Sequence, residues 1–299
     1  MTNSFERVLM VRNPASGGAN ADVYREIESA LSDLGRVSVC EPSSPDDLDH
    51  EVQAAAADAD LVVTAGGDGT FNCTVNALHE RLDELTFAVI PLGTGNDLAR
   101  TFGFAGDPLE AARGLGTGTQ RRLDVSRASG AGVNRLFVNA CIGGFPVEVD
   151  EELNEKLKKM LGPLAFVIGG IKAFPDLDRS QVAINGEQVS ECIAVGIGNG
   201  RTCGGGVEVW PRAEPDDGDL DGAALCASSL SQALLLAAKV RRGGHEDLEG
   251  VLTTRAKKLS VTADPPIEFN VDGELIGLKS PATFEVVARL RLLVPSIPA

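Results

Sequence analysis

Residues 57–78 read ADADLVVTAGGDGTFNCTVNAL, and this stretch decides the fold of the chain. An apolar run (61–65) enters a segment of three glycines, an aspartate and a threonine (66–70), and a helical pattern follows. An ordinary turn needs one glycine, or two. Three glycines around Asp68 therefore predict a backbone that comes very close to a neighbouring group, with a carboxylate held at the same place.

The first 125 residues alternate between strand and helix patterns. We expect strands over 7–12, 37–41, 61–65, 85–90 and 121–126, and helices over 21–35, 45–59, 71–82, from about residue 97, and over 107–115. The strands are apolar throughout, which is typical of a parallel sheet covered on both faces. We predict that residues 1–125 form a nucleotide-binding α/β domain with a parallel, doubly wound sheet.

The pattern changes after about residue 126. Short β-type runs occupy 135–142, 181–189, 191–198, 220–227, 257–263, 267–274, 283–288 and 289–294. Asn185–Gly186 and Asp272–Gly273 are strong hairpin dipeptides. We predict that residues 126–299 form a mostly antiparallel β-sandwich, or a distorted barrel, which binds the substrate and whose last residues can return to the first domain.

The composition is strongly acidic, with 43 aspartates and glutamates against 27 lysines and arginines and a net charge of −16. Nucleic acid is an unsuitable partner, because neutralising phosphates requires a basic face. Such a surface is typical of halophilic proteins, and we hypothesise a high-salt cytoplasm. No apolar run has the length of a transmembrane helix, and the N-terminus lacks a signal-peptide pattern, so we expect a cytoplasmic protein. Six scattered cysteines and three distant histidines indicate neither a zinc site nor a disulfide framework.

Three glycine-rich loops follow strands of the first domain: NPASGG (13–18), GGDGT (66–70) and PLGTGNDLAR (91–100). In an open α/β sheet, ligands bind at the carboxyl ends of the strands, so we expect these loops to face one crevice. Backbone N–H groups at such loops suit phosphate oxygens. The standard GxxxxGK[ST] and GxGxxG patterns and the GxSxG nucleophile elbow are missing, and a nucleotide phosphate site remains the leading interpretation.

An acidic residue accompanies these loops at Asp68 and Asp97, and another, Asp124, ends the next strand. Carboxylates repel phosphates unless a cation lies between them, and Mg²⁺ carried with a nucleotide is the usual cation. Asp68 and Asp97 could instead be turn residues or helix caps, and we expect Asn96 to cap the helix that follows it. Capping does not explain an acid at each of three adjacent positions.

The three loops, the DDGxLD pattern within 196–222 and the DGE triplet of 272–274 together resemble the diacylglycerol kinase catalytic family, which includes bacterial lipid kinases and sphingosine kinases. The motifs occur in the family's order over nearly the whole chain, whereas GGDGT alone is shared with NAD kinases and phosphofructokinases. The resemblance implies an ATP-dependent lipid kinase, a phosphotransferase whose acceptor is a diacylglycerol-like or related alcohol. The alternatives are an NAD kinase and a non-catalytic nucleotide-binding protein of the same fold.

The resemblance also implies roles for individual residues. The expected ATP site contains Asn13, Ser16, Gly66, Gly67, Asp68, Gly69, Thr70, Asn72, Gly93, Thr94, Asn96, Asp97 and Asp124. Of these, the three aspartates are expected to organise Mg²⁺ through water, and Asp68 counts among the catalytic residues. Glu274, with Asp272 beside it, is implied as the proton acceptor. A second, structural Mg²⁺ is implied at Asp217, with backbone oxygens near Glu214 and Asp219.

Both later motifs have simpler interpretations, since DGE suits a plain hairpin turn and the 214–222 segment suits a solvated acidic loop. The chain also departs from the family, with Cys73 in place of a glutamate, and with Thr202 and Cys203 in place of aromatic residues. These changes put a nucleotide contact in doubt and predict a roomier cleft.

A helical pattern over 151–174 carries four of the eight lysines of the chain: Lys156, Lys158, Lys159 and Lys172. It is either an apolar lid for a lipid tail, with lysines near anionic headgroups, or an ordinary helix packed on the sandwich. We expect a lipid substrate at the membrane surface and a peripheral protein, and a homodimer is left open.

Overall fold

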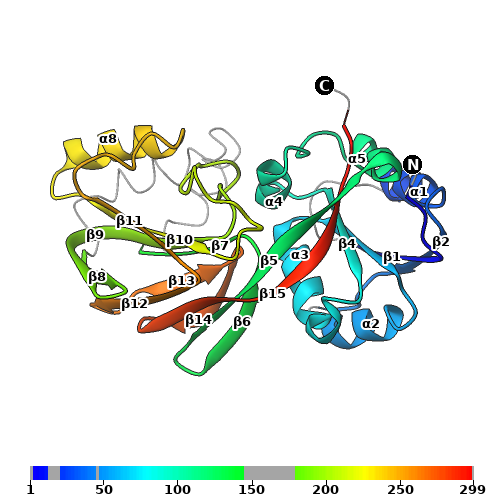
Figure 1. Ribbon diagram of the computed structural model, residues 1–299, viewed down its shortest axis with the longest axis horizontal. Coiled ribbons are helices and arrows are strands. Elements are labelled where there is room, and N and C mark those ends of the chain that lie inside the picture. Colours follow the sequence, from blue (N-terminus) through cyan, green and yellow to red (C-terminus); the bar gives the residue numbers. More distant parts are fainter. Residues whose placement is uncertain (1–2, 13–20, 45–46, 145–178, 298–299) are drawn as a thin grey trace. The chain divides into compact units, whose positions relative to one another are not determined.

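The computed structural model describes residues 3–12, 21–44, 47–144 and 179–297. The chain divides into two compact units (Figure 1). The first contains Met1–Val125 and Val287–Ala299, and the second contains Ser126–Val286. Asn13, Ser16 and the helical pattern over 151–174 lie outside the described residues.

The first unit is built on a parallel sheet, as predicted. Its strands are β1 (Arg7–Arg12), β2 (Arg36–Cys40), β3 (Leu61–Gly66) and β4 (Thr86–Pro91), in the order β4-β3-β1-β2, and β15 (Ala282–Val294) pairs with β4 through Arg291 and Leu292. Every residue of β3 and β4 is buried. Strands that are buried on both faces need apolar side chains on both, which explains the continuous apolar runs.

Helices cover both faces of this sheet (Figure 1). They are α1 (Ala21–Leu31), α2 (Leu48–Ala55), α3 (Asp68–Ala77), α4 (Asp97–Thr101) and α5 (Pro108–Gly114), with short 3₁₀ turns at His79–Arg81 and Leu115–Thr117. One core contains Tyr24 and Ile27 of α1, Ala111 of α5, and the side chains of β1 and β3 that point to the same face. The helix expected over 71–82 in fact begins at Asp68, so Asp68, Gly69 and Thr70 lie in its first turn and not in a loop.

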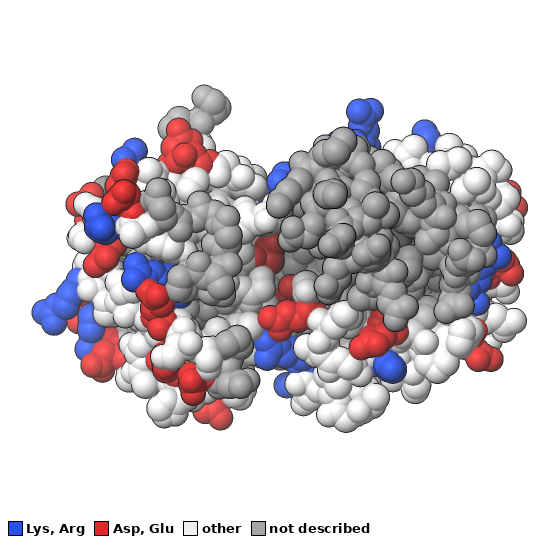
Figure 2. Space-filling view, turned by 180° about the vertical axis from the view of Figure 1, so that it is seen from behind, with Lys and Arg blue, Asp and Glu red and all other residues white. Residues whose placement is uncertain are grey.

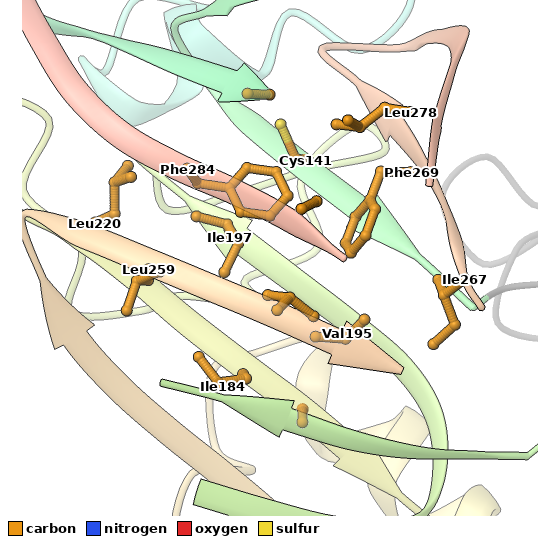
Figure 3. Close-up of a cluster of buried hydrophobic side chains, with 14 of the residues drawn as sticks. Cys141, Ile184, Val195, Ile197, Leu220, Leu259, Ile267, Phe269, Leu278 and Phe284 are labelled. Atoms are coloured by element: carbon orange, nitrogen blue, oxygen red, sulfur yellow. The ribbon is translucent and has the colours of Figure 1, made fainter. Parts of the chain in front are cut away.

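The second unit is antiparallel throughout its described strands. These are β5 (Thr119–Gly130, which begins in the first unit), β6 (Val133–Phe137), β7 (Ala140–Gly143), β8 (Ser180–Ile184), β9 (Glu187–Gly198), β10 (Leu220–Cys226), β11 (Val251–Ala256), β12 (Lys258–Asp264), β13 (Glu268–Val271) and β14 (Glu274–Lys279). Their inner side chains form one apolar core (Figure 3). The rings of Phe137 and Phe269 both pack edge-on against Phe284, with centroids 6.2 and 5.2 Å away.

Both expected hairpins are confirmed. Asn185 and Gly186 have φ of 49° and 86°, and Asp272 and Gly273 have φ of 46° and 97°, so each pair makes a two-residue turn with two left-handed residues. Such turns match the twist of the flanking strands.

Four other strand and helix assignments differ from the sequence analysis. The run 135–142 breaks into β6 and β7, and the runs 283–288 and 289–294 form one strand, β15. Helix α8 (Leu230–Val240) and strand β11 were not predicted. Within the part of the chain that the structure describes, no helix combines the length and the apolar character needed to cross a membrane.

Candidate active site

Two of the glycine-rich loops touch through their backbones. A Cβ atom on Gly67 would lie 3.1 Å from the Cα of Gly93, and one on Gly93 would lie 2.6 Å from the Cα of Gly67. A Cβ on Gly66 would collide with the side chain of Thr70, at 2.8 Å. These glycines are therefore needed for packing between the end of β3, the start of α3 and the loop after β4, whatever else approaches them.

The side chain of Asp68 caps α4 from the neighbouring loop. Its Oδ2 accepts a hydrogen bond from the backbone N–H of Asp97 (2.9 Å), and its Oδ1 accepts one from Leu98 (3.1 Å). Burial raises the pKa of Asp68, with a smaller upward contribution from the nearby charge of Asp97, while the backbone hydrogen bonds oppose the rise. The carboxylate thus fixes the position of one loop relative to the other, as expected if Asp68 is a helix cap.

Asn96 does not cap α4, contrary to expectation. Its φ is 51°, and its side chain turns back into its own loop. Its Oδ1 accepts from the backbone N–H of Gly93 (3.0 Å), and its Nδ2 donates to the carbonyl of the same residue (2.7 Å). Arg100 makes a third hydrogen bond within this loop, from its Nε to the carbonyl of Gly95 (2.9 Å). The loop between β4 and α4 is therefore closed on itself, and Asp68 supplies the missing cap.

The other two acids of this unit are buried. Asp97 is 5% exposed and Asp124 is fully buried on β5. Arg289 of β15 donates from Nε to Oδ1 of Asp124 at 2.5 Å. A buried carboxylate is stable only with a compensating charge or hydrogen bonds, and Arg289 provides the charge.

The remaining described members of the expected ATP site differ in exposure. Thr70 and Asn72 are buried in the first turns of α3, where the backbone and side-chain oxygens of Asn72 accept from Asn76. Thr94 is exposed at the tip of its loop, and Gly69 and Cys73 are partly buried. Of this group, Thr94 has the side chain most accessible to a ligand.

In the second unit, Asp272 organises the backbone around its hairpin. Its Oδ2 accepts from the N–H of Val138 (2.8 Å), and its Oδ1 accepts from those of Asn139 (3.0 Å) and Ala140 (2.8 Å). Asp272 is 7% exposed. These charge-assisted bonds satisfy N–H groups that would otherwise lie buried without partners, and they explain why the run 135–142 breaks into two strands.

Glu274 begins β14, two residues after this buried aspartate, and is left partly exposed. Its side chain is 42% exposed, and Oε2 lies 3.5 Å from Nη2 of Arg135 on β6. The two carboxylates of the DGE triplet therefore have different environments. Asp272 is committed to the backbone, whereas Glu274 can reach a small molecule and exchange a proton with it.

A buried amide network supports the same region. Asn139 donates from Nδ2 to the carbonyl of Thr202 (2.9 Å), and Asn199 donates from Nδ2 to the carbonyl of Val138 (2.8 Å). The backbone N–H groups of Asn199 and Gly200 return two bonds to the carbonyl of Asn139. The segment that departs from the family at Thr202 is thus attached directly to the strand ends beneath the DGE hairpin.

The acidic segment around Asp217 contains its own counter-ion. Arg255 of β11 forms an ion pair with Asp217, and its Nε lies 3.7 Å from Oδ2 of Asp219. Oδ1 of Asp217 also accepts from the backbone N–H of Asp219 (2.9 Å). Further carboxylates lie near this segment: burial, and then the charges of Glu246, Asp219 and Glu214, raise the pKa of Asp221 to about 6.

These groups allow a test of whether Mg²⁺ suits the chain. Among the described residues, no three histidine, cysteine, aspartate or glutamate side chains are grouped closely enough to hold one metal ion directly. Oxygen donors are the ones that Mg²⁺ prefers, and it commonly keeps several of its waters. The Asp217 segment fits this chemistry, because it offers one carboxylate, neighbouring backbone oxygens and further carboxylates nearby. Arg255 would have to move away from Asp217 for the ion to bind.

Sequence reasoning missed three cations that pair with the candidate acids. Arg135, Arg255 and Arg289 are the partners of Glu274, Asp217 and Asp124, and no motif marks any of them. The structure brings Asp68 and Asp97 together in the first unit, and Asp272 with the backbone of 138–140 in the second.

Comparisons with known proteins agree with this picture. Residues 7–128 match the diacylglycerol kinase catalytic domain, and residues 140–294 match the YegS C-terminal NAD kinase beta sandwich-like domain. A "Probable lipid kinase YegS-like" protein of Stenotrophomonas maltophilia is 34% identical over 83% of this chain and 81% of its own length. A diacylglycerol kinase of Bacillus subtilis is 28% identical over 97% of both chains.

Solved structures show the same two-domain fold. The crystal structure of a diacylglycerol kinase from Bacillus anthracis str. Sterne superposes with a TM-score of 0.73 at 22% identity, covering 98% of this chain and 99% of the other. A second crystal structure from that organism reaches 0.81 at 24% identity, with the same coverage. Together with the matched domains and the curated relatives, this establishes that the chain belongs to the diacylglycerol kinase catalytic family of ATP-dependent lipid kinases, which are phosphotransferases with an alcohol group as acceptor.

Proposed function

We propose that this chain transfers the γ-phosphoryl group of ATP to the hydroxyl of a diacylglycerol-like lipid, with Glu274 as the proton acceptor. The hydroxyl oxygen forms a bond to the γ-phosphorus, the bond from that phosphorus to the bridging oxygen of ADP breaks, and the hydroxyl proton passes to the carboxylate of Glu274. The product is a phosphate monoester of the lipid. Phosphoryl transfer depends mainly on positioning and charge stabilisation. A carboxylate within hydrogen-bond reach of the hydroxyl group can accept its proton.

This assignment rests on the different environments of the two carboxylates in the DGE triplet. Both carboxylate oxygens of Asp272 accept hydrogen bonds, from three backbone N–H groups in all, and these bonds fix the hairpin. Glu274 is 42% exposed, and its Oε2 lies 3.5 Å from Nη2 of Arg135. This difference supports Glu274 as the base and Asp272 as the residue that positions it.

For the nucleotide, the first unit offers glycine backbones and an exposed threonine. We assign ATP to the loops that contain Gly66–Gly67 and Gly93–Thr94, and the Asp68 carboxylate keeps these loops in register. Asp97 and Asp124 remain the proposed water-mediated contacts to Mg²⁺. When bound, Mg²⁺ supplies neutralising charge for the polyphosphate. Asn13 and Ser16 complete the proposed set by resemblance.

The test is a transfer assay with γ-labelled ATP and Mg²⁺. One arm offers vesicles that contain diacylglycerol, a second offers a total lipid extract, and a third offers NAD. The proposal expects label in a lipid fraction and none in NAD. Label in NAD would identify an NAD kinase, and label in neither lipid arm would favour a non-catalytic nucleotide-binding protein.

A further inference from the structure

Helix α8 (Leu230–Val240) is attached to the second unit by one face. Ser229 caps it, since its Oγ accepts from the backbone N–H of Gln232 at 3.3 Å. Ala233, Leu236 and Val240 are buried in a core that also contains Trp210 and Leu225. Their spacing of three and four residues places them on one side of the helix, as in any amphipathic surface helix.

The opposite face of α8 is also apolar. Leu230, Leu234 and Leu235 are 46%, 44% and 50% exposed, and Ala238 between them is exposed as well. At 100° per residue, Leu234, Leu235 and Ala238 lie opposite the three buried residues together with the exposed Ser231, and Leu230 lies at the edge of the same face. Three exposed leucines on one face of a surface helix indicate an interaction surface.

Helix α1 (Ala21–Leu31) shows what an ordinary surface helix of this chain looks like. It has the same length as α8 and also buries one face, through Tyr24, Ile27 and Leu31. Its fully exposed positions past the first residue are polar: Asp22, Arg25, Glu26 and Ser29. The leucines of α8 are therefore a local feature and not a general property of the surface.

Cations lie at the end of the apolar face. Lys239, Arg241 and Arg242 are all exposed, and none forms an ion pair with another residue in the described parts of the chain. Several other exposed cations adjoin carboxylates, as Arg25 does with Asp22, and blue and red side chains intermingle over much of the coloured surface in Figure 2. Three cations therefore lie within four residues at this end of α8, in a chain with a net charge of −16.

We propose that this face of α8 (Figure 1) docks on the interface of an anionic lipid bilayer; this rests on the proposed function, whose acceptor is a lipid. Leucines that enter the headgroup boundary beside lysine and arginine are the pattern of a helix that lies in a membrane surface. Charge complementarity selects this occupant, because the cations attract anionic headgroups.

The experiment measures binding to vesicles of equal parts phosphatidylglycerol and phosphatidylcholine by co-sedimentation, without nucleotide. Leu234→Gln/Leu235→Gln removes apolar area and keeps helix propensity, and we expect binding to weaken roughly thirtyfold. Arg241→Gln/Arg242→Gln should also weaken it about thirtyfold, because each cation near such a surface contributes about 1 kcal/mol. The second loss should shrink in high salt.

Matched controls use exposed residues of the first unit. Val39→Gln replaces another exposed apolar side chain, and Arg25→Gln/Arg113→Gln removes two exposed arginines from surface helices. These variants should bind vesicles like the parent chain. Circular dichroism melts of all variants check that they fold, so that a loss of binding is not a loss of structure.

Two outcomes would overturn the proposal. One is unchanged vesicle binding in both α8 variants, and the other is a shift of the oligomeric state with the leucine variant, which would make the face a protein interface. Transfer to a short-chain, dispersed diacylglycerol separates docking from catalysis: the α8 variants should keep this activity while losing activity on vesicles. If the parent chain phosphorylates no lipid but its vesicle binding still depends on α8, the proposed function fails and the docking surface stands.

Discussion

Asp68 and Asp97 are joined across two loops by a hydrogen bond from the backbone N–H of Asp97 to Oδ2 of Asp68, at 2.9 Å. With the second bond, from Leu98, this makes one side chain the cap of a helix that belongs to another loop. A residue that sequence reasoning assigned to metal and phosphate chemistry therefore also determines the shape of the site.

Asp68→Asn should damage both structure and activity. Asparagine keeps one acceptor oxygen and places an N–H₂ group against the second backbone N–H, so we expect a loss of about 1–2 kcal/mol in the stability of the first unit. The loops would shift, and lipid phosphorylation should fall at least about tenfold. Urea denaturation and the labelled-ATP assay measure the two effects.

Asp107→Ala is the control for Asp68. Asp107 caps α5, with its Oδ1 accepting from the backbone N–H groups of Leu109 (2.8 Å) and Glu110 (3.0 Å), but it lies outside the loops. Removal of this cap should cost about 1 kcal/mol in stability and leave turnover unchanged. Equal turnover in Asp68→Asn and the parent chain would show that the cap is irrelevant to catalysis.

Glu274→Gln and Asp272→Asn should fail differently. Removing the base should lower kcat about 10²- to 10⁴-fold with little change in stability, because Glu274 is partly exposed. Asp272→Asn weakens three buried hydrogen bonds and should reduce stability by roughly 2–4 kcal/mol. Steady-state kinetics and thermal denaturation of the same preparations distinguish the two roles.

The control for the base is Glu268→Gln on the neighbouring strand of the same hairpin. Glu268 is 40% exposed and lies 3.9 Å from Lys279, so its environment is close to that of Glu274. Its removal should leave kcat unchanged. A kcat for Glu274→Gln within a factor of about three of the parent would remove Glu274 as the proton acceptor.

The sequence was sufficient for the alternation of strands and helices and for both hairpins, because these depend on local patterns. Apolar runs identified β3 and β4, and Asn185–Gly186 and Asp272–Gly273 could be placed in turns from their conformational preferences alone. Helix α8 was not predicted, because a helix that is apolar on opposite faces lacks the periodicity by which surface helices are found.

Pairings between distant residues could not be predicted. Asp124 and Arg289 are 165 positions apart, and Arg135 and Glu274 are 139 apart. The charge of each residue is visible in the sequence, but which charges meet is set by strand order, and no local pattern encodes that order. For the same reason the sequence favoured Asn96 as the cap of α4, and the alternative that Asp68 is a helix cap did not say which helix it caps.

Mg²⁺ should stabilise the second unit through Asp217. We expect millimolar Mg²⁺ to raise the Tm of the parent chain relative to EDTA, and Asp217→Asn to abolish the increase. Arg255→Gln removes the competing counter-ion, so its Tm should depend more strongly on Mg²⁺. Lys258→Gln, which breaks an exposed ion pair with Glu285 in the same unit, is the control and should behave like the parent. If the Tm of every variant were independent of Mg²⁺, Asp217 would bind no metal ion, and Arg255 would remain its counter-ion.

Acid should destabilise the second unit partly through His245. Its side chain is fully buried, its Nε2 lies 3.1 Å from the carbonyl of Val209, and burial lowers its pKa. The unfolded chain then binds the proton more readily than the folded chain, so stability is lost as the pH falls below about 6.5. This group contributes at most about 2 kcal/mol between pH 6.5 and pH 5.

His245→Gln should flatten that part of the stability profile, whereas His50→Gln, at an exposed position, should leave it unchanged. Urea denaturation at a series of pH values measures both. Parallel profiles for the parent and His245→Gln would show that another group dominates the acid response.

The backbone contact between Gly67 and Gly93 has a consequence for anyone who wishes to engineer nucleotide preference. Neither loop has room for a Cβ atom toward the other, so randomising one loop while the other keeps its shape should yield few active clones. Thr94 is next to Gly93 and is exposed, so its side chain can be changed without separating the two loops. A directed-evolution library should therefore start from this position.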